Sequence, residues 1–215
     1  MSRAKTKKFL EFKRLDNCFD KNNLNLIKKK INSADEIYLE LASGRGEYTV
    51  YLAEKNPNTL CIAVDFRSNR LVWGAKIAKE KHLFNALFLR ERIQNLPELF
   101  KIKKASKIWI VFPDPFERKK QEKHRLTNIR FLHIYKKISQ KDCQINIKTD
   151  NKHLYEYTVK VLKQTKYKIL NNTTDLLNDM QLQQLKDYEE LILPTKYQKL
   201  ALKKNKQIYY IKFAL

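Results

Sequence analysis

The chain has 215 residues, 43% of them apolar, which is enough for one α/β domain with a substantial core. The chain has 45 Lys and Arg against 23 Asp and Glu. The resulting net charge of +22 predicts a polyanionic partner, with nucleic acid as the first candidate. An AT-rich genome would also enrich lysine, so part of this charge has a second explanation that needs no partner.

Export, membrane anchoring and metal binding are not predicted. No apolar run is long enough to span a bilayer, and MSRAKTKKF at the N-terminus lacks the apolar centre of a signal peptide. Cys18, Cys61 and Cys143 lie far apart without the spacing of metal ligands, and the four histidines show no such spacing either. We therefore expect a cytoplasmic protein with free thiols, no metal and no membrane segment.

Residues 1–32 are expected to form a basic N-terminal arm and a lead-in helix over 25–31, ahead of a main domain over 33–215. The arm is inferred from residues 1–20, where basic side chains are frequent and hydrophobic periodicity is weak. Two interpretations stay open for it: an arm that becomes ordered on its partner, or a solvated flexible tail.

The main domain begins with a strand, a small-residue turn and a helix. EIYLEL over 36–41 predicts a buried strand, ASGRGE follows as a turn, and an amphipathic helix covers about 47–55. TLCIAV over 59–64 predicts a second strand, and a helix follows over 68–82. This succession is typical of the entry into a doubly wound α/β sheet.

The alternation of strands and helices continues toward the C-terminus, with Thr127 as the expected N-cap of one helix. Trp73 and Trp109 fall inside apolar patterns and are expected in the core. We expect a mostly parallel sheet with helices on both faces. Its further strands are predicted at 86–89, 107–112, 144–148 and 207–213, and its further helices at 127–138 and 153–164.

Four carboxylates close predicted strands: Glu40, Asp65, Asp114 and Asp150. The carboxyl ends of parallel strands share one edge of a sheet, where the ligands of such folds bind. Asp65 follows Gly46 at roughly the 20-residue interval at which an acid reaches ribose hydroxyls in nucleotide-binding folds. The alternative without a ligand gives Glu40 an ion pair and Asp150 the N-cap of the next helix.

Asp114 lies between two prolines at the tip of the buried strand KIWIVF. Pro113 and Pro115 cannot donate to a sheet ladder, so the strand must stop there and the carboxylate must face a cleft. A basic run follows, which suits a polyanion better than a small metabolite. Its members are Arg118, Lys119, Lys120, Lys123 and Arg125.

The turn ASGRG does not match a dinucleotide-binding fingerprint, because Thr49 stands where the third glycine of GxGxxG would be. Together with the strand-end acids and the Asp-Pro-aromatic turn, it favours S-adenosylmethionine. Gly44 and Gly46 would let the backbone approach the methionine end of this cofactor, and Asp65 would accept from the ribose hydroxyls.

Six sequence blocks occur in the order of one known family. They are LELASGRGE at 39–47, AVDFRSNR at 63–70, LPELF at 96–100, FPDPFERKKQEKHRLTNIRF at 112–131, KTDN at 148–151 and TKYQK at 195–199. In them the chain resembles the bacterial tRNA (guanine-N7)-methyltransferases. The resemblance implies a Rossmann-like class I methyltransferase fold with a seven-stranded sheet. It also implies methyl transfer from S-adenosylmethionine to nitrogen 7 of a guanosine in the tRNA variable loop, guanosine 46, by a monomer or a homodimer.

The resemblance also implies roles for individual residues. Asp114 would be catalytic, stabilising the positive charge that develops on guanine. The cofactor site would include Glu40, Gly44, Gly46, Asp65, Arg92 and Asp114. The guanosine would meet Arg118, Asp150, Thr195, Tyr197 and Gln198, with Tyr197 as the candidate for stacking. The remaining tRNA contacts would come from Lys119, Lys120, Lys123, His124 and Arg125.

The chemistry agrees with these roles. Nitrogen 7 of guanine carries an in-plane lone pair and no proton, so the reaction needs alignment rather than a general base. The Watson–Crick edge of guanine presents two N–H donors that one carboxylate can accept, and Asp150 is the candidate for that contact.

Several positions depart from the family pattern, among them Arg118 in place of the usual Lys and residues 140–143 in place of a glycine pair. Arg92 stands where the family has an Asp that receives the adenine amino group, and arginine has no acceptor. Glu91 or Gln94 would then substitute, or adenine would be held by stacking and backbone alone. Gln198 replaces a Glu, and Ala42 replaces a Gly, a modest change if its φ stays negative. A catalytically weakened descendant that binds tRNA is therefore the alternative, and methylation of another RNA or base is a less favoured third.

Overall fold

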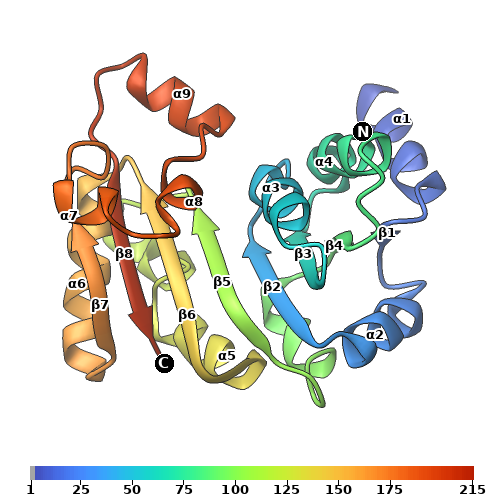
Figure 1. Ribbon diagram of the computed structural model, residues 1–215, viewed down its shortest axis with the longest axis horizontal. Helices are drawn as coiled ribbons and strands as arrows, with labels where there is room; N and C mark the ends of the chain where they lie inside the picture. Colours follow the sequence, from blue (N-terminus) through green and yellow to red (C-terminus); the bar gives the residue numbers. More distant parts are fainter. Residues whose placement is uncertain (1–2) are drawn as a thin grey trace.

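One mixed sheet forms the centre of the computed structural model, which describes residues 3–215 (Figure 1). The strand order is β1-β4-β3-β2-β5-β6-β8-β7. All pairs from β1 to β6 are parallel, whereas β8 runs antiparallel to both β6 and β7. The strands are β1 Cys18–Phe19, β2 Glu36–Leu41, β3 Thr59–Asp65, β4 Ala86–Arg90, β5 Ala105–Val111, β6 Ser139–Thr149, β7 Lys168–Thr173 and β8 Tyr209–Ala214.

Helices cover both faces of the sheet, as predicted, and each face has its own apolar core. One core takes side chains from α2 Leu24–Ser33, the 3-10 helix η1 Ile93–Glu98, α5 Ile129–Ile138 and α6 Lys152–Thr165. The other takes them from α1 Arg3–Arg14, α3 Glu47–Lys55, α4 Ser68–Glu80, α7 Met180–Gln183, α8 Tyr188–Ile192 and α9 Lys196–Leu202. The predicted class of fold is confirmed, with eight strands in place of the seven expected.

Alternation along the central strands explains the two cores. In β5, Ile108 and Ile110 face one core while Trp109 between them faces the other, because successive side chains of a strand point to opposite faces. Trp109 is fully buried, as expected. Trp73 is not a core residue, because 41% of it is exposed and the Arg45 guanidinium lies 4.9 Å from the centre of its ring.

The N-terminal segment belongs to the fold over its described length. Helix α1 packs against α4 through Phe12, which is 1% exposed, and β1 pairs with β4 at the edge of the sheet. For residues 3–19 this corrects the expectation of an arm or flexible tail, while Met1 and Ser2 lie outside the described residues. The lead-in helix is α2, and the domain boundary at residue 33 stays a prediction.

Two helix caps differ from those predicted. The side chain of Asn128, not Thr127, accepts the capping hydrogen bond of α5, because Thr127 is buried and its hydroxyl accepts from Thr158 instead. Helix α6 is capped by Asn151, whose side chain accepts from the Leu154 amide, so Asp150 is left for other contacts.

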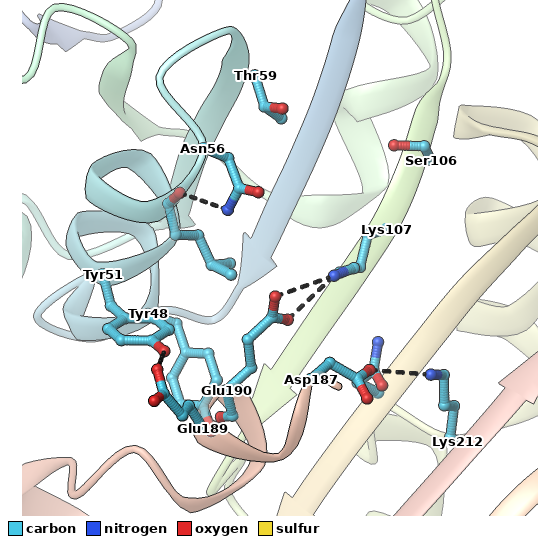
Figure 2. Close-up of polar contacts among 12 residues, drawn as sticks. Tyr48, Tyr51, Asn56, Thr59, Ser106, Lys107, Asp187, Glu189, Glu190 and Lys212 are labelled. Atoms are coloured by element: carbon cyan, nitrogen blue, oxygen red, sulfur yellow. Dashed lines mark hydrogen bonds and ion pairs between the residues drawn. The ribbon is translucent and has the colours of Figure 1, made fainter. Parts of the chain in front are cut away.

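The segment between β7 and β8 crosses one face of the sheet, where charged contacts fix it to β5 and β8. Figure 2 shows the Lys107 ammonium group directed at both carboxylate oxygens of Glu190, at 3.3 and 3.0 Å. Asp187 pairs with Lys212 of β8 at 3.1 Å. These pairs place α8, and after it α9, beside the carboxyl ends of the parallel strands. No described helix is long and apolar enough to cross a membrane.

Candidate active site

The glycine turn between β2 and α3 is a narrow left-handed turn. Gly44 and Gly46 have φ of +57° and +70°, which favour glycine. A Cβ on Gly46 would lie 2.7 Å from the Phe88 ring and 3.2 Å from Ala63, so the turn packs directly on the neighbouring strands. A Cβ on Gly44 would meet no atom within 4 Å, so this backbone is open to a ligand.

Ala42 at the start of the same turn also has a positive φ, +52°. Alanine is a modest replacement for glycine only at negative φ, and the structure shows the opposite sign here. An alanine in this region carries a steric cost of roughly 1–2 kcal/mol. The turn is therefore held by its surroundings in a conformation that a glycine would adopt freely.

Glu40 does not form the ion pair considered from the sequence. Its carboxylate accepts from the backbone N–H and the hydroxyl of Thr49, at 2.8 and 2.7 Å. It thereby satisfies an N–H group in the first turn of α3, whose cap residue Gly46 has no side chain. Burial raises the pKa of Glu40 to about 8, although these hydrogen bonds oppose the shift.

Asp65 closes β3 and holds the glycine turn in place. One carboxylate oxygen accepts from the Gly44 amide at 2.9 Å, and the other accepts from the Arg67 amide at 2.8 Å. Burial raises its pKa, and the two backbone donors counteract that rise. The carboxylate therefore connects the first two strand ends, where the sequence predicted a ligand site.

Three adjoining cavities meet at Asp114, which lines all of them. The first extends over the glycine turn; its walls carry acids, two arginines, small residues and aromatic rings, including Glu40, Gly44, Asp65, Thr195 and Tyr197. The second is mainly apolar and includes Phe66, Ile93, Phe116, His124, Leu126 and Phe131. The third is bounded by Pro113, Pro115, Asp150, Tyr197, Lys204 and Lys206.

The turn that carries Asp114 is strained on both sides. Phe112 and Phe116 have φ of +48° and +46°, a conformation that is uncommon for aromatic residues. The Phe112 amide donates to the Lys148 carbonyl at 2.8 Å, and the Asp114 side chain is exposed at the mouth of the cavities. The prediction that Asp114 faces a cleft is confirmed.

Arg92 lines the apolar cavity, and so do Glu91 and Gln94, the two residues considered as acceptors for the adenine amino group in its place. Glu91 is occupied, because its carboxylate accepts from the Arg92 amide at 2.7 Å and from the Asn95 side chain at 2.8 Å. Gln94 is exposed and lines the cavity, so its side-chain oxygen is the freer acceptor. The cavity wall otherwise offers mainly apolar and aromatic surface.

The residues expected to meet guanosine divide into two groups. Asp150, Thr195 and Tyr197 line the cavities, with Asp150 held by Lys206 at 2.7 Å. Thr195 is buried and caps α9 by accepting from the Gln198 amide. Gln198 is only 2% exposed and is absent from the cavity walls, since its side-chain oxygen accepts from Lys148 at 2.6 Å. The structure therefore gives Gln198 an internal role.

The basic run forms a 3-10 helix, η2 Lys119–His124, with none of its residues buried. Lys119, Lys120 and Lys123 are exposed there, and Arg118, also exposed, stands at its N-terminal end. His124 is exposed too, but its ring lies 5.6 Å from that of Phe116 at the apolar cavity.

Arg125 differs from the rest of the run. It is 2% exposed and donates to the carbonyls of Phe116 and Glu117, at 3.1 to 3.2 Å. Its guanidinium also lies 4.3 Å from the centre of the Tyr157 ring. Arg125 thus holds the strained turn from inside, and the predicted phosphate contact is corrected for this residue.

Comparison with known proteins identifies the family. The family model described as "Putative methyltransferase" matches residues 34–211. A tRNA (guanine-N(7)-)-methyltransferase of Cytophaga hutchinsonii is 34% identical over 221 residues, covering 99% of this chain and 98% of the relative. Another of this name, from Christiangramia forsetii, is 37% identical over 179 residues, 83% of this chain and 78% of the relative. The chain belongs to the tRNA (guanine-N7)-methyltransferase family.

Solved structures confirm the fold of this family member. The 16S rRNA methyltransferase KamB superposes with a TM-score of 0.63 at 13% identity, covering 87% of this chain and 91% of that one. At this identity the likeness concerns the fold alone. It establishes that the methyltransferase architecture is the one present here.

Several residues of the candidate site do not follow from the sequence patterns. Phe66 and Phe116 shape the apolar cavity, and Ser43 has a buried hydroxyl with no hydrogen-bond partner. Phe66 directly follows Asp65, which is a usable signal. The loop and short helix expected over 194–204 agree with α9, but no pattern singles out Lys204 or Lys206 as site residues. The expected lack of a metal site stays a prediction; within residues 3–215 no cluster of three or more His, Cys, Asp or Glu side chains was found.

Proposed function

We propose that the protein transfers a methyl group from S-adenosylmethionine to nitrogen 7 of a guanosine in tRNA. One observation carries the proposal: a single exposed carboxylate, Asp114, borders the cavity over the glycine turn, the apolar cavity and the cavity at Asp150. A methyl donor and a base that enter from different sides would therefore meet at a negative charge. The family relationship supplies the reaction class.

The first two cavities fit the methyl donor. The open face of Gly44 and the unpartnered Ser43 hydroxyl offer close backbone approach and a free hydrogen-bonding group. Asp65 has acceptor capacity beyond its two backbone donors, which suits ribose hydroxyls. Phe66 and Ile93 in the apolar cavity suit an adenine ring, with Gln94 as the acceptor for its amino group.

When bound, the cofactor supplies a methyl group on a positively charged sulfur. Nitrogen 7 of guanine has a lone pair and no proton, so the protein needs no general base and contributes alignment and electrostatics. The product guanine is cationic. Asp114 stands where its carboxylate stabilises this charge as it develops, and Pro113 and Pro115 fix the backbone that carries it.

The third cavity suits the guanine base. The Asp150 carboxylate can accept from the two N–H groups of the Watson–Crick edge, and the exposed ring of Tyr197 offers a face for stacking. Lys206 now pairs with Asp150, both partners being partly exposed. An exposed pair of this kind contributes little stability, so guanine can replace the lysine at small cost.

The tRNA body is expected at η2. Lys119, Lys120 and Lys123 are exposed and take part in none of the ion pairs among the described residues, so they are available to phosphates. We assign the target to the variable loop, at guanosine 46, and place the protein in the cytoplasm as a monomer or a homodimer.

A tRNA-binding protein without transfer activity is the second candidate. Arg92 favours it, because a cation at the apolar cavity adds no acceptor for adenine. A transcript test decides between them: tRNA with a guanosine at the variable-loop target should gain 7-methylguanosine, and the same tRNA with adenosine there should not. Binding of both transcripts with methylation of neither would support the second candidate.

A further inference from the structure

Lys148 is a buried amine in the family's KTD segment, close to the candidate site. It lies near the end of β6 and is 0% exposed. It belongs to none of the ion pairs among the described residues. Burying a lysine without a carboxylate partner costs free energy, because the charged amine loses its hydration. Hydrogen bonds to other groups must offset this loss.

The compensation consists of three hydrogen bonds to three different helices. The amine donates to the Tyr48 hydroxyl at 2.9 Å, to the Leu191 carbonyl at 2.5 Å and to the Gln198 side-chain oxygen at 2.6 Å. Tyr48 belongs to α3, Leu191 to α8 and Gln198 to α9. Three donated bonds require all three hydrogens of an ammonium group.

These contacts join the two sides of the candidate site. Helix α3 begins at the glycine turn, and its Tyr48 hydroxyl also donates to the Glu190 carbonyl at 2.7 Å. Figure 2 shows Tyr48 and Glu190 side by side, with Glu190 also bound to Lys107. At the start of α9, the Lys196 amide donates to both carboxylate oxygens of Glu47, each at 3.1 Å.

We infer that Lys148 is a positioning residue for methyl transfer, which fixes Thr195 and Tyr197 relative to the glycine turn. The inference rests on the proposed function, because it assigns the glycine turn to the methyl donor and Tyr197 to the base. Lys148 itself lines none of the three cavities and touches neither reactant. Lys148 therefore affects how the methyl donor and the base are aligned. A methyl transfer that needs no general base depends mainly on this alignment.

The protonation state of Lys148 provides a separate readout. Burial lowers its pKa to about 7, and a neutral amine has only two hydrogens for the three acceptors. The titratable groups around it are Tyr48 from α3 and Tyr210, directly across on β8; burial raises the pKa of both phenols. The nearby carboxylates are already bound, Glu40 by Thr49 and Glu190 by Lys107. Loss of the proton should loosen α8 and α9 as pH rises through about 7.

The test compares Lys148→Met with Lys199→Met, a control at an exposed lysine of α9. In the folded Lys148→Met protein we expect kcat to fall about tenfold or more, because small misplacements of reactants are costly. The Kd for S-adenosylmethionine, measured by calorimetry, should stay within about threefold, since an alignment defect lowers turnover rather than ground-state binding. The control should match the wild type. A folded Lys148→Met protein with wild-type kcat would overturn the inference.

Gln198→Glu distinguishes positioning from mere structural support. A carboxylate beside Lys148 keeps the acceptor and favours the ammonium form, so the alkaline decline of kcat should move to higher pH. Gln198→Leu removes the acceptor and should reduce kcat without that movement. If Gln198→Glu left the pH profile unmoved, the ammonium group would not be the feature that matters.

Hydrogen exchange keeps this test separate from the proposed function. Amides of residues 188–202 should exchange faster in Lys148→Met than in Lys199→Met, whether or not the protein transfers methyl groups. Unchanged exchange would contradict the inference. An inactive wild type with the expected exchange difference would instead show that the proposed function is wrong while the positioning of α8 and α9 by Lys148 is real.

Discussion

The two halves of the sheet position the candidate site by different means. On the β2–β4 side, parallel strands and a glycine turn in direct contact with Phe88 fix the backbone through close packing. On the β5–β8 side, the segment carrying Thr195 and Tyr197 is held by side-chain contacts such as Lys107 with Glu190 and Lys148 with Gln198. The side proposed for the cofactor is therefore fixed by close packing together with the hydrogen bonds of Asp65 and Glu40 to the glycine turn and α3. The side proposed for the base is fixed by side-chain contacts between segments distant in sequence.

The largest effect on activity is expected at Asp114, where the two halves of the site meet. Asp114→Ala should lower kcat roughly 10²-fold, because it removes the charge nearest the developing cation, an effect of the size found for single electrostatic groups in active sites. Single-turnover kinetics would measure the change. Asp16→Ala, at an exposed acid just after α1, should leave kcat unchanged. A small decrease in Asp114→Ala would mean that alignment alone drives the reaction.

The cofactor side should be intolerant of added volume. Gly46→Ala places a Cβ 2.7 Å from the Phe88 ring at a φ of +70°, and we expect a decrease of about 2–4 kcal/mol in unfolding free energy. Gly44→Ala meets no atom within 4 Å, so its effect on stability should be smaller while cofactor binding weakens. Urea denaturation and calorimetry measure the two effects. Equal decreases in stability would show that packing does not distinguish the two glycines.

The base side should respond to removal of charge. Glu190→Gln leaves the mostly buried Lys107 without its partner and should cost about 2 kcal/mol, between the values for exposed and fully buried pairs. Glu189→Gln breaks a pair with Lys55 that is exposed on both sides, so no change is expected. Thermal unfolding of both variants makes the comparison. If both variants unfolded like the wild type, α8 would be held by its apolar contacts instead.

The salt dependence of tRNA binding tests the exposed lysines of η2, which lie outside both halves of the site. Replacing Lys119, Lys120 and Lys123 by alanine should reduce the slope of log affinity against log salt by about 0.7 to 0.9 for each phosphate that is no longer neutralised. A double replacement at Lys29 and Lys30, exposed on α2, serves as the control and should leave the slope unchanged. An unchanged slope in the η2 variant would place the tRNA elsewhere on the protein.

A further effect concerns the dependence of stability on pH. The pKa of Glu40 is about 8 in the folded protein against an ordinary value of 4.5. Between these values the native state keeps a proton that the unfolded chain releases, so unfolding free energy falls as pH rises from about 4.5 to about 8. Glu40→Gln should flatten this fall, as measured by urea denaturation at several pH values. A fall of the same steepness in the variant would exclude Glu40 as its source.

The same contrast explains how much the sequence revealed. The strands and α-helices from 36 to 165 followed from hydrophobic periodicity, whereas the 3-10 helices η1 and η2 did not. The carboxyl-edge acids followed from their places at strand ends. The burial of Arg125 and Gln198 did not, because both are internal partners of residues distant in sequence, a kind of contact that no local pattern records. Short elements such as β1 and α7 were missed because two to four residues carry no periodic signal.

The central claim is that this site methylates guanosine in tRNA at nitrogen 7. Purified protein should be incubated with labelled S-adenosylmethionine and bulk bacterial tRNA, and the digested tRNA analysed for 7-methylguanosine. We predict that the wild type forms this nucleoside and that Asp114→Ala, folded and still binding the cofactor, forms little. A folded wild type that binds both tRNA and the cofactor but forms no 7-methylguanosine would contradict the account.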